Sequence, residues 1–221
     1  MKRILAIGGA VIKTALDELK QAAQKKMFDV LIHNGGSIFH DFQLATELIP
    51  YHSHSLDALM INPDLNKDAS ELLWQWINEN CVLHNFGKSG VLAPEGSVTR
   101  ICETNGIEVM LFTILGGDFW QLFDDRWVMF AYKTKNDFNK LCCIMNEEEF
   151  DFICMGSAVI HPEVFTKALA VAQSKKFRGY VVDFMDMYRP KTRIAKYGKY
   201  FKMTHQEFLE KWLLEGDKIF D

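Results

Sequence analysis

The stretch FDVLIHNGGSIFHD, residues 28–41, decides the fold class. Its continuous apolar run Val30-Leu31-Ile32 is typical of a parallel strand that is buried on both faces. Gly35 and Gly36 allow a tight turn and the close approach of a ligand, and Ser37 is predicted to be the N-cap of the helix that follows. A strand, a glycine turn and a helix N-terminus in this order favour a bound phosphate. Because the full dinucleotide fingerprint is missing, an ordinary tight turn fits the same residues.

Strand and helix patterns alternate along the rest of the chain. Predicted strands cover residues 3–7, 29–32, 108–114, 150–154 and 179–184, and predicted helices cover residues 11–26, 37–48, 68–83, 97–104 and 162–174. Residues 51–65 are predicted to form a loop. The alternation predicts an α/β fold, a doubly wound and mostly parallel sheet with helices on both faces, Rossmann-like and built as a single domain of residues 1–221.

Composition excludes several classes of protein. Hydrophobic residues make up 48% of the chain and charged residues 24%, which is typical of a globular protein and not of a disordered one. The net charge of -4 gives no general attraction to nucleic acid or to an anionic membrane. No apolar run reaches the roughly 18 to 20 residues that span a bilayer. The apolar N-terminal stretch is short and continues into a charged helix, so we expect a strand of a cytoplasmic protein.

Cysteine and aromatic content give two further expectations. The five cysteines have no metal-like spacing, which predicts reduced thiols and no metal site. Aromatic residues make up 13% of the chain, including five tryptophans, and aromatic side chains are enriched at protein interfaces. We therefore expect a homo-oligomer.

Small residues follow three of the predicted strands, at positions 34–37, 115–118 and 155–158. In open α/β sheets, ligands bind beyond the carboxyl ends of the strands. Three such turns at one edge predict a cleft for a nucleotide-like ligand. The candidate cofactor-binding residues are Gly35, Gly36, Ser37, Asp41, Gly116, Gly117, Asp118, Gly156 and Ser157.

Several polar residues near these turns have two interpretations each. Asp41 could bind a ribose or an amine, or could simply complement the dipole of its helix. Asp118 could reach a ribose hydroxyl or could form a turn. His40 is a candidate general base or a surface residue. His161 and Glu163 could belong to a pocket or to an ordinary helix start.

These segments resemble deoxyhypusine synthase and its bacterial relatives. The family's strand of the type V-D-V-L-V, with a glycine turn and a His-Asp pair, is matched by residues 28–41. Its later helix, link and strand are similar to residues 101–118, and its second glycine-rich strand end is similar to residues 155–165. The resemblance covers residues 4–190 and implies the NAD-binding superfamily that also holds the sirtuins, with NAD as the cofactor.

The resemblance also implies a reaction, in which NAD oxidises an amine by hydride transfer and the imine carbon is then transferred. The family's catalytic lysine lies in a W-G-K context, and its nearest match here is Lys199 in the segment KYGKY at residues 196–200. With Lys199 and His40 as catalytic residues, the chain is expected to be a transferase for a small amine or polyamine. It is shorter than deoxyhypusine synthases and lacks their Gly/Ser/Asp-rich lysine loop. The alternative is a non-catalytic assembly or binding protein that keeps the fold with a degraded site.

Overall fold

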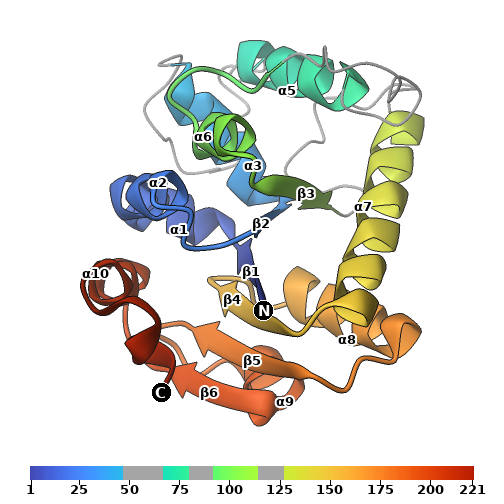
Figure 1. Ribbon diagram of the computed structural model, residues 1–221. Coiled ribbons are helices and arrows are strands. Elements are labelled where there is room, and N and C mark those ends of the chain that lie inside the picture. Colours follow the sequence, from blue (N-terminus) through green and yellow to red (C-terminus); the bar gives the residue numbers. More distant parts are fainter. Residues whose placement is uncertain (47–66, 80–91, 114–126) are drawn as a thin grey trace.

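The computed structural model of the protein describes residues 1–46, 67–79, 92–113 and 127–221 (Figure 1). Across these residues, six strands form one sheet in the order β3-β2-β1-β4-β5-β6, and all neighbouring strands are parallel. The chain winds outward from β1 to β3 and then crosses back to β4, as in doubly wound dinucleotide-binding sheets. The predicted α/β, Rossmann-like fold is confirmed.

The strands are β1 (Lys2–Ile7), β2 (Val30–Asn34), β3 (Glu108–Phe112), β4 (Phe150–Met155), β5 (Phe177–Val182) and β6 (Gly198–Phe201). The first five are the predicted strands, with ends that differ from the prediction by at most two residues. β6 is not among them. It is an edge strand of four residues that pairs with β5 alone, so its sequence carries no continuous apolar run.

Helices cover both faces of the sheet (Figure 1). One face carries α1 (Gly9–Thr14), α2 (Leu16–Gln24), α3 (Gly35–Ala45), α6 (Val98–Asn105) and α10 (His205–Glu215). The opposite face carries α7 (Trp127–Glu147), α8 (Ile160–Ala172) and α9 (Tyr188–Arg193), and α5 (Lys67–Glu79) packs against α3 and α7. Short 3-10 helices, η3 (Ala195–Tyr197) and η4 (Gly216–Phe220), complete the C-terminal part.

The central position of β1 explains why the sequence of this strand is apolar from Ile4 to Ile7. Leu5 and Ile7 pack into the core on the α1 side, whereas Ile4 and Ala6 pack into the core on the α8 side. All four side chains are fully buried. A strand with helices on both faces has no solvent side, so the alternation of polar and apolar residues disappears.

The predicted helices correspond to helices of the structure wherever the chain is described. The helix predicted over residues 11–26 is divided into α1 and α2, because Ala15 leaves the helical conformation with φ -152° and ψ 34°. The predicted loop at residues 51–65 lies outside the described residues.

Helix α7 is not predicted by hydrophobic spacing. Its buried side runs through Phe130, Lys133, Asp137 and Leu141, so two charged residues interrupt the apolar pattern. Lys133 Nζ donates to Asp137 Oδ2 over 2.6 Å, and the backbone N–H of Leu111 donates to the same carboxylate over 2.8 Å. Each charge therefore has a partner inside the protein, which is what burial of an ion pair requires.

Two of the tryptophans that suggested an oligomer belong to the core of the chain itself. Trp212 is fully buried and Trp76 is 2% exposed. Trp212 packs against Phe28, Phe208 and Phe220, which accounts for its aromatic surroundings without a second chain. The homo-oligomer stays a prediction. None of the described helices is long and apolar enough to cross a membrane.

Candidate functional site

Three glycine turns meet at the carboxyl edge of the sheet. Gly8 and Gly9 follow β1, Gly35 and Gly36 follow β2, and Gly156 follows β4. A Cβ atom on Gly8 would lie 1.9 Å from the carbonyl oxygen of Gly156, and a Cβ atom on Gly9 would lie 3.3 Å from the carbonyl carbon of Gly36. The turns thus pack backbone against backbone, which residues without a side chain permit.

The sequence analysis includes Gly35, Gly36 and Gly156 among the candidate residues but not Gly8 and Gly9. The signal for them is the one used at Gly35, a glycine pair directly after a buried strand. The contact between the turns of β1 and β4 depends on the strand order, which the sequence pattern does not give.

The start of α3 is occupied by its own chain. Asn34 Oδ1 accepts a hydrogen bond from the Ser37 N–H over 2.8 Å, and Ser37 Oγ accepts one from the Asn34 N–H over 3.0 Å. This reciprocal capping box corrects the predicted cap, because Asn34 is the N-cap and Ser37 is the third helical residue. Gly35, Gly36 and Ser37 are all buried, so this helix start offers little backbone surface to a phosphate.

Asp41 caps a different helix. Its carboxylate accepts hydrogen bonds from the Val98 N–H over 2.8 Å, from the Thr99 N–H over 2.9 Å and from Thr99 Oγ1 over 2.6 Å. The side chain is 1% exposed. Burial raises the pKa of Asp41, and the hydrogen bonds from Thr99 and Val98 act against that rise. Its bonding capacity is therefore used to hold the N-terminus of α6 against α3.

His33 joins this buried network at the end of β2. Its Nδ1 lies 2.9 Å from Ser37 Oγ, and its Nε2 lies 3.2 Å from Thr99 Oγ1. Burial, with a smaller effect of nearby His161, lowers the pKa of His33 to about 3. The imidazole is therefore neutral at physiological pH and connects α3 to α6 through hydroxyl groups.

His161 lies in the first turn of α8 and is fully buried. Within the described part of the chain, neither ring nitrogen makes a hydrogen bond of ordinary geometry. Burial lowers the pKa of His161 to about 4, against a smaller opposing effect of the His33 backbone. Ser157 is also buried, and its Oγ accepts a long hydrogen bond of 3.4 Å from the His161 N–H.

His40 and His205 lie beside the glycine turns. His40 is 3% exposed, its Nδ1 lies 3.3 Å from Gln43 Oε1, and a Cβ atom on Gly9 would lie 3.1 Å from its ring. His205, in the first turn of α10, is 2% exposed and lies against Gly156. Burial lowers the pKa of His205. No group of three His, Cys, Asp or Glu side chains among the described residues is arranged to hold a metal.

Of the remaining predicted site residues, Lys199 is not brought to these turns. Lys199 is exposed on the edge strand β6, with its Nζ 5.0 Å from the centre of the Phe201 ring. β6 lies four strand spacings from β2, roughly 19 Å at the usual spacing between strands. Gly116, Gly117 and Asp118 lie outside the described residues.

The accessible part of the edge lies where the sheet order reverses between β1 and β4. Ala10 is exposed, Gly9, Gly156 and Ala158 are half-exposed, and Val159 is 50% exposed. These residues have small or aliphatic side chains, so the backbone is open to a ligand at this point. The candidate site therefore includes the predicted turn at Gly156 and adds Gly8 and Gly9, which were not among the predicted residues.

Comparisons with known proteins identify the fold. No protein-family model matches the chain, and no curated protein matches its sequence. AgrE, solved with ornithine and NAD+, superposes with a TM-score of 0.62 at 13% identity, over 99% of this chain and 30% of AgrE. A protein assigned as LOR/SDH from Methanococcus maripaludis S2 gives 0.58 at 14% identity, over 99% of this chain and 61% of that chain. A protein assigned as a deoxyhypusine synthase from Entamoeba histolytica gives 0.57 at 11% identity, over 97% and 74%.

At these identities the likeness shows the fold alone. The fold that the resemblance implied is therefore found in a solved structure assigned to the same family. The chain spans 30% of the length of AgrE and 61% of that of the LOR/SDH protein. The activities and ligands of those larger proteins are therefore not assigned to this chain by the comparison.

The buried histidines predict a loss of stability in acid. The unfolded chain takes up protons on His33 and His161 near pH 6.5, but the folded chain takes them up only near pH 3 and pH 4. The unfolded state then binds more protons, so the free energy of unfolding falls as the pH drops below 6.5. We expect each histidine to contribute about 2 kcal/mol to that fall by about pH 5.

Urea denaturation at several pH values, with the parent and with His161→Leu, measures this effect. In the parent, the free energy of unfolding falls between about pH 7 and pH 5. In the variant this fall should be smaller by about 2 kcal/mol, because one titrating group is gone. Equal pH dependence of the two proteins would show that His161 takes up its proton in the folded state as readily as in the unfolded state.

Proposed function

We propose that this protein binds an NAD-type dinucleotide at the carboxyl edge of its sheet, between β1 and β4. The observation that carries the proposal is the meeting of the Gly8 and Gly156 turns where the strand order reverses. Doubly wound sheets bind dinucleotides at this reversal, because successive connections run to opposite faces there and leave a crevice. The presence of NAD+ in AgrE, which has the same fold, supports the proposal.

The residues at the reversal fit such a ligand. The backbone of Gly9, Ala10, Gly156 and Ala158 is open enough for the close approach of a pyrophosphate. His205 Nε2 is buried beside Gly156 without a hydrogen-bond partner in the described part of the chain, so a polar group of the ligand would satisfy it.

Other predicted site residues keep a place in this proposal. Gly36 would support the site through its packing on Gly9, and Gly35 precedes it in the first turn of α3. Gly116, Gly117 and Asp118 lie outside the described residues, and their predicted part in the site stays a prediction. Bound NAD would supply a hydride acceptor, and the substrate that fits the family resemblance is a small amine or polyamine.

A second candidate function is non-catalytic binding or assembly. One observation favours it, because Lys199, the nearest match to the family's catalytic lysine, lies on the edge strand β6 and not at the glycine turns. Under this alternative the protein acts as a homo-oligomer. Light scattering across a wide concentration range measures the mass, and a monomer throughout would remove the assembly role.

Ala10→Phe tests the dinucleotide site by calorimetric titration with NAD+ and ADP-ribose. Ala10 is exposed directly after Gly9, so the phenyl ring should obstruct the ligand without disturbing the core. We expect binding at least about tenfold weaker than in the parent. Formation of reduced nicotinamide with polyamines then separates an enzyme from a binding protein.

Ala170→Phe is the matched control, since Ala170 is also an exposed helical alanine but lies near the far end of α8. It should bind both ligands as the parent does. The proposal fails if the parent binds neither ligand, or if the two variants bind with equal affinity.

A further inference from the structure

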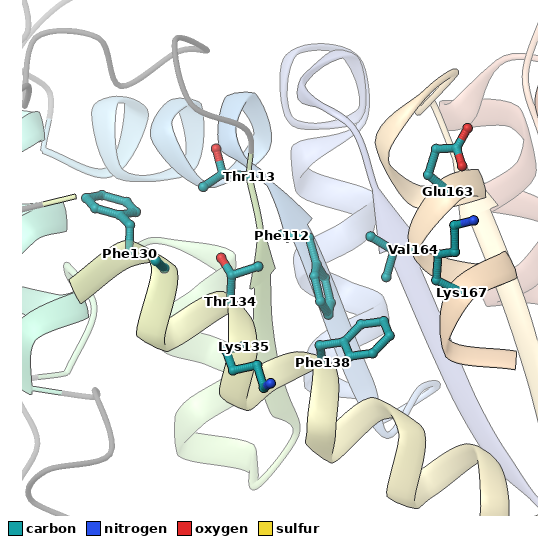
Figure 2. Close-up of a pocket in the computed structure, with 10 residues that line it drawn as sticks. Phe112, Thr113, Phe130, Thr134, Lys135, Phe138, Glu163, Val164 and Lys167 are labelled. Carbon is teal, nitrogen blue, oxygen red and sulfur yellow. The ribbon is translucent and has the colours of Figure 1, made fainter. Parts of the chain in front are cut away.

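A groove lies between α7 and α8, next to the carboxyl end of β3 (Figure 2). The two helices are joined at their C-terminal halves, where Asn146 Nδ2 donates to the carbonyl oxygen of Ala172 over 3.1 Å. Nearer the carboxyl edge of the sheet they line a cavity of about 530 Å³. This volume falls in the range of small-molecule sites, roughly 300 to 1,000 Å³.

The body of the groove is apolar. Figure 2 shows Phe112 at the end of β3 and Phe138 of α7 lying between the two helices, opposite Val164 of α8. Phe130 of α7 also belongs to the lining, but its ring is 2% exposed and stacks on Trp74. The two aromatic rings of Phe112 and Phe138 and the aliphatic side chain of Val164 favour the hydrocarbon part of a ligand, since affinity in such pockets comes mainly from apolar area removed from water.

The rim of the groove is cationic. Lys135 extends from α7 and Lys167 from α8, and both are exposed (Figure 2). Of the lysines on α7, Lys133 pairs with Asp137 and Lys140 pairs with Glu108. Lys135 has no carboxylate partner among the described residues, which leaves its charge available to a ligand.

The single carboxylate in the lining does not cancel these charges. Glu163 forms an ion pair with Arg193, which lies outside the groove lining. Arg193 accordingly holds the pKa of Glu163 below its usual value, with smaller effects of Arg189 and Lys167. With Glu163 already neutralised, the rim keeps an excess of positive charge.

We propose that the groove between α7 and α8 binds a small amphipathic organic acid, whose hydrocarbon body packs on Phe112, Phe138 and Val164 and whose carboxylate lies near Lys135 and Lys167. Charge complementarity selects the acid over an uncharged or basic ligand of the same shape. The inference goes beyond the proposed dinucleotide site, because none of its lining residues belongs to the turns of β1 or β4.

Decanoate is the probe, with decanol and decylamine as partners of the same chain length. Calorimetric titration should give one decanoate site per chain. Decanol should bind about tenfold more weakly, because it lacks the charge that the two lysines complement, and decylamine more weakly still. Equal binding of decanoate and decanol, or no binding of decanoate, would overturn the proposal.

Two variants locate the site. Lys135→Gln with Lys167→Gln should weaken decanoate binding about tenfold and leave decanol binding unchanged. The matched control, Lys202→Gln with Lys218→Gln, removes the same charge from exposed lysines outside the groove and should change neither affinity. Equal losses in the two double variants would mean that only net charge matters, which contradicts the proposal.

Val164→Trp fills the groove and tests its apolar part. Val164 is half-buried, so the larger side chain should enter the cavity with little effect on folding, which circular dichroism checks. Decanoate affinity should fall more than about tenfold. If the variant instead converts a dimer to a monomer, a second copy covers the groove and the proposal is wrong. Ala10→Phe should bind decanoate like the parent, so failure of the dinucleotide site is distinguishable.

Discussion

Gly8→Ala is expected to destabilise the protein more than any other single methyl addition at the candidate site. The new Cβ atom would lie 1.9 Å from the carbonyl oxygen of Gly156, a backbone atom that cannot rotate out of the way as a flexible side chain could. Gly8 also donates its N–H to the carbonyl oxygen of Met155 over 2.9 Å, so β1 and β4 would have to separate at the centre of the sheet. We expect the free energy of unfolding in urea to fall by about 3 kcal/mol or more.

The backbone conformation of Gly8 makes this a test of packing. With φ -93° and ψ 168°, it is open to any residue, so the cost is steric. Gly106→Ala is the control, because Gly106 has φ 71° and nothing within 4 Å of a Cβ atom. That variant should cost only about 1 to 2 kcal/mol of left-handed strain. If Gly8→Ala costs no more than Gly106→Ala, the turns of β1 and β4 do not touch.

Asp41→Ala is expected to cost roughly 3 to 5 kcal/mol of unfolding free energy. The substitution removes the acceptor for the N–H groups of Val98 and Thr99 and for Thr99 Oγ1, in a place where the carboxylate is 1% exposed. Buried N–H and O–H donors without an acceptor lose their hydrogen bonds to water without forming new ones, which destabilises the folded state. Urea denaturation monitored by circular dichroism measures the loss.

The control for this change is Asp217→Ala. Asp217 accepts from Arg3 over 2.7 Å, but its side chain is 67% exposed, so removing it should cost at most about 1 kcal/mol. Asp41→Asn separates a structural role from a ligand role. A ligand role predicts that Asp41→Asn keeps the stability of the parent and loses NAD+ binding, whereas the capping role predicts lower stability.

Local chemistry explains why the central strands of the sheet could be predicted from the sequence. A strand buried on both faces has to be apolar at every position, and Val30-Leu31-Ile32 satisfies that condition within three neighbouring residues. The glycine pair after β2 and the polar residue before it are equally local. The same local reading missed α7, because the buried ion pair of Lys133 and Asp137 replaces apolar residues on the covered side of the helix.

The candidate site depended on contacts that no local pattern contains. Asp41 carries a carboxylate near a glycine turn, as a ligand-binding residue would. Its hydrogen-bond partners, however, lie 57 and 58 residues away in α6. Their proximity follows from the packing of α3 beside α6 on one face of the sheet. Its role was therefore decided by tertiary structure.

The sequence by itself determined five of the six strands in the described residues and a mostly parallel sheet, because burial and turn chemistry act on neighbouring residues. Only the tertiary structure decided that the turns of β1 and β4 meet, since the strand order puts Gly8 against Gly156 across 148 residues of chain (156 minus 8). The predicted set already contained Gly35, Gly36 and Gly156, and the strand order adds the turn of Gly8 and Gly9 between them. The proposed ligand site lies where two turns meet and their backbone is accessible. Which turns meet depends on the order of the strands in the folded sheet.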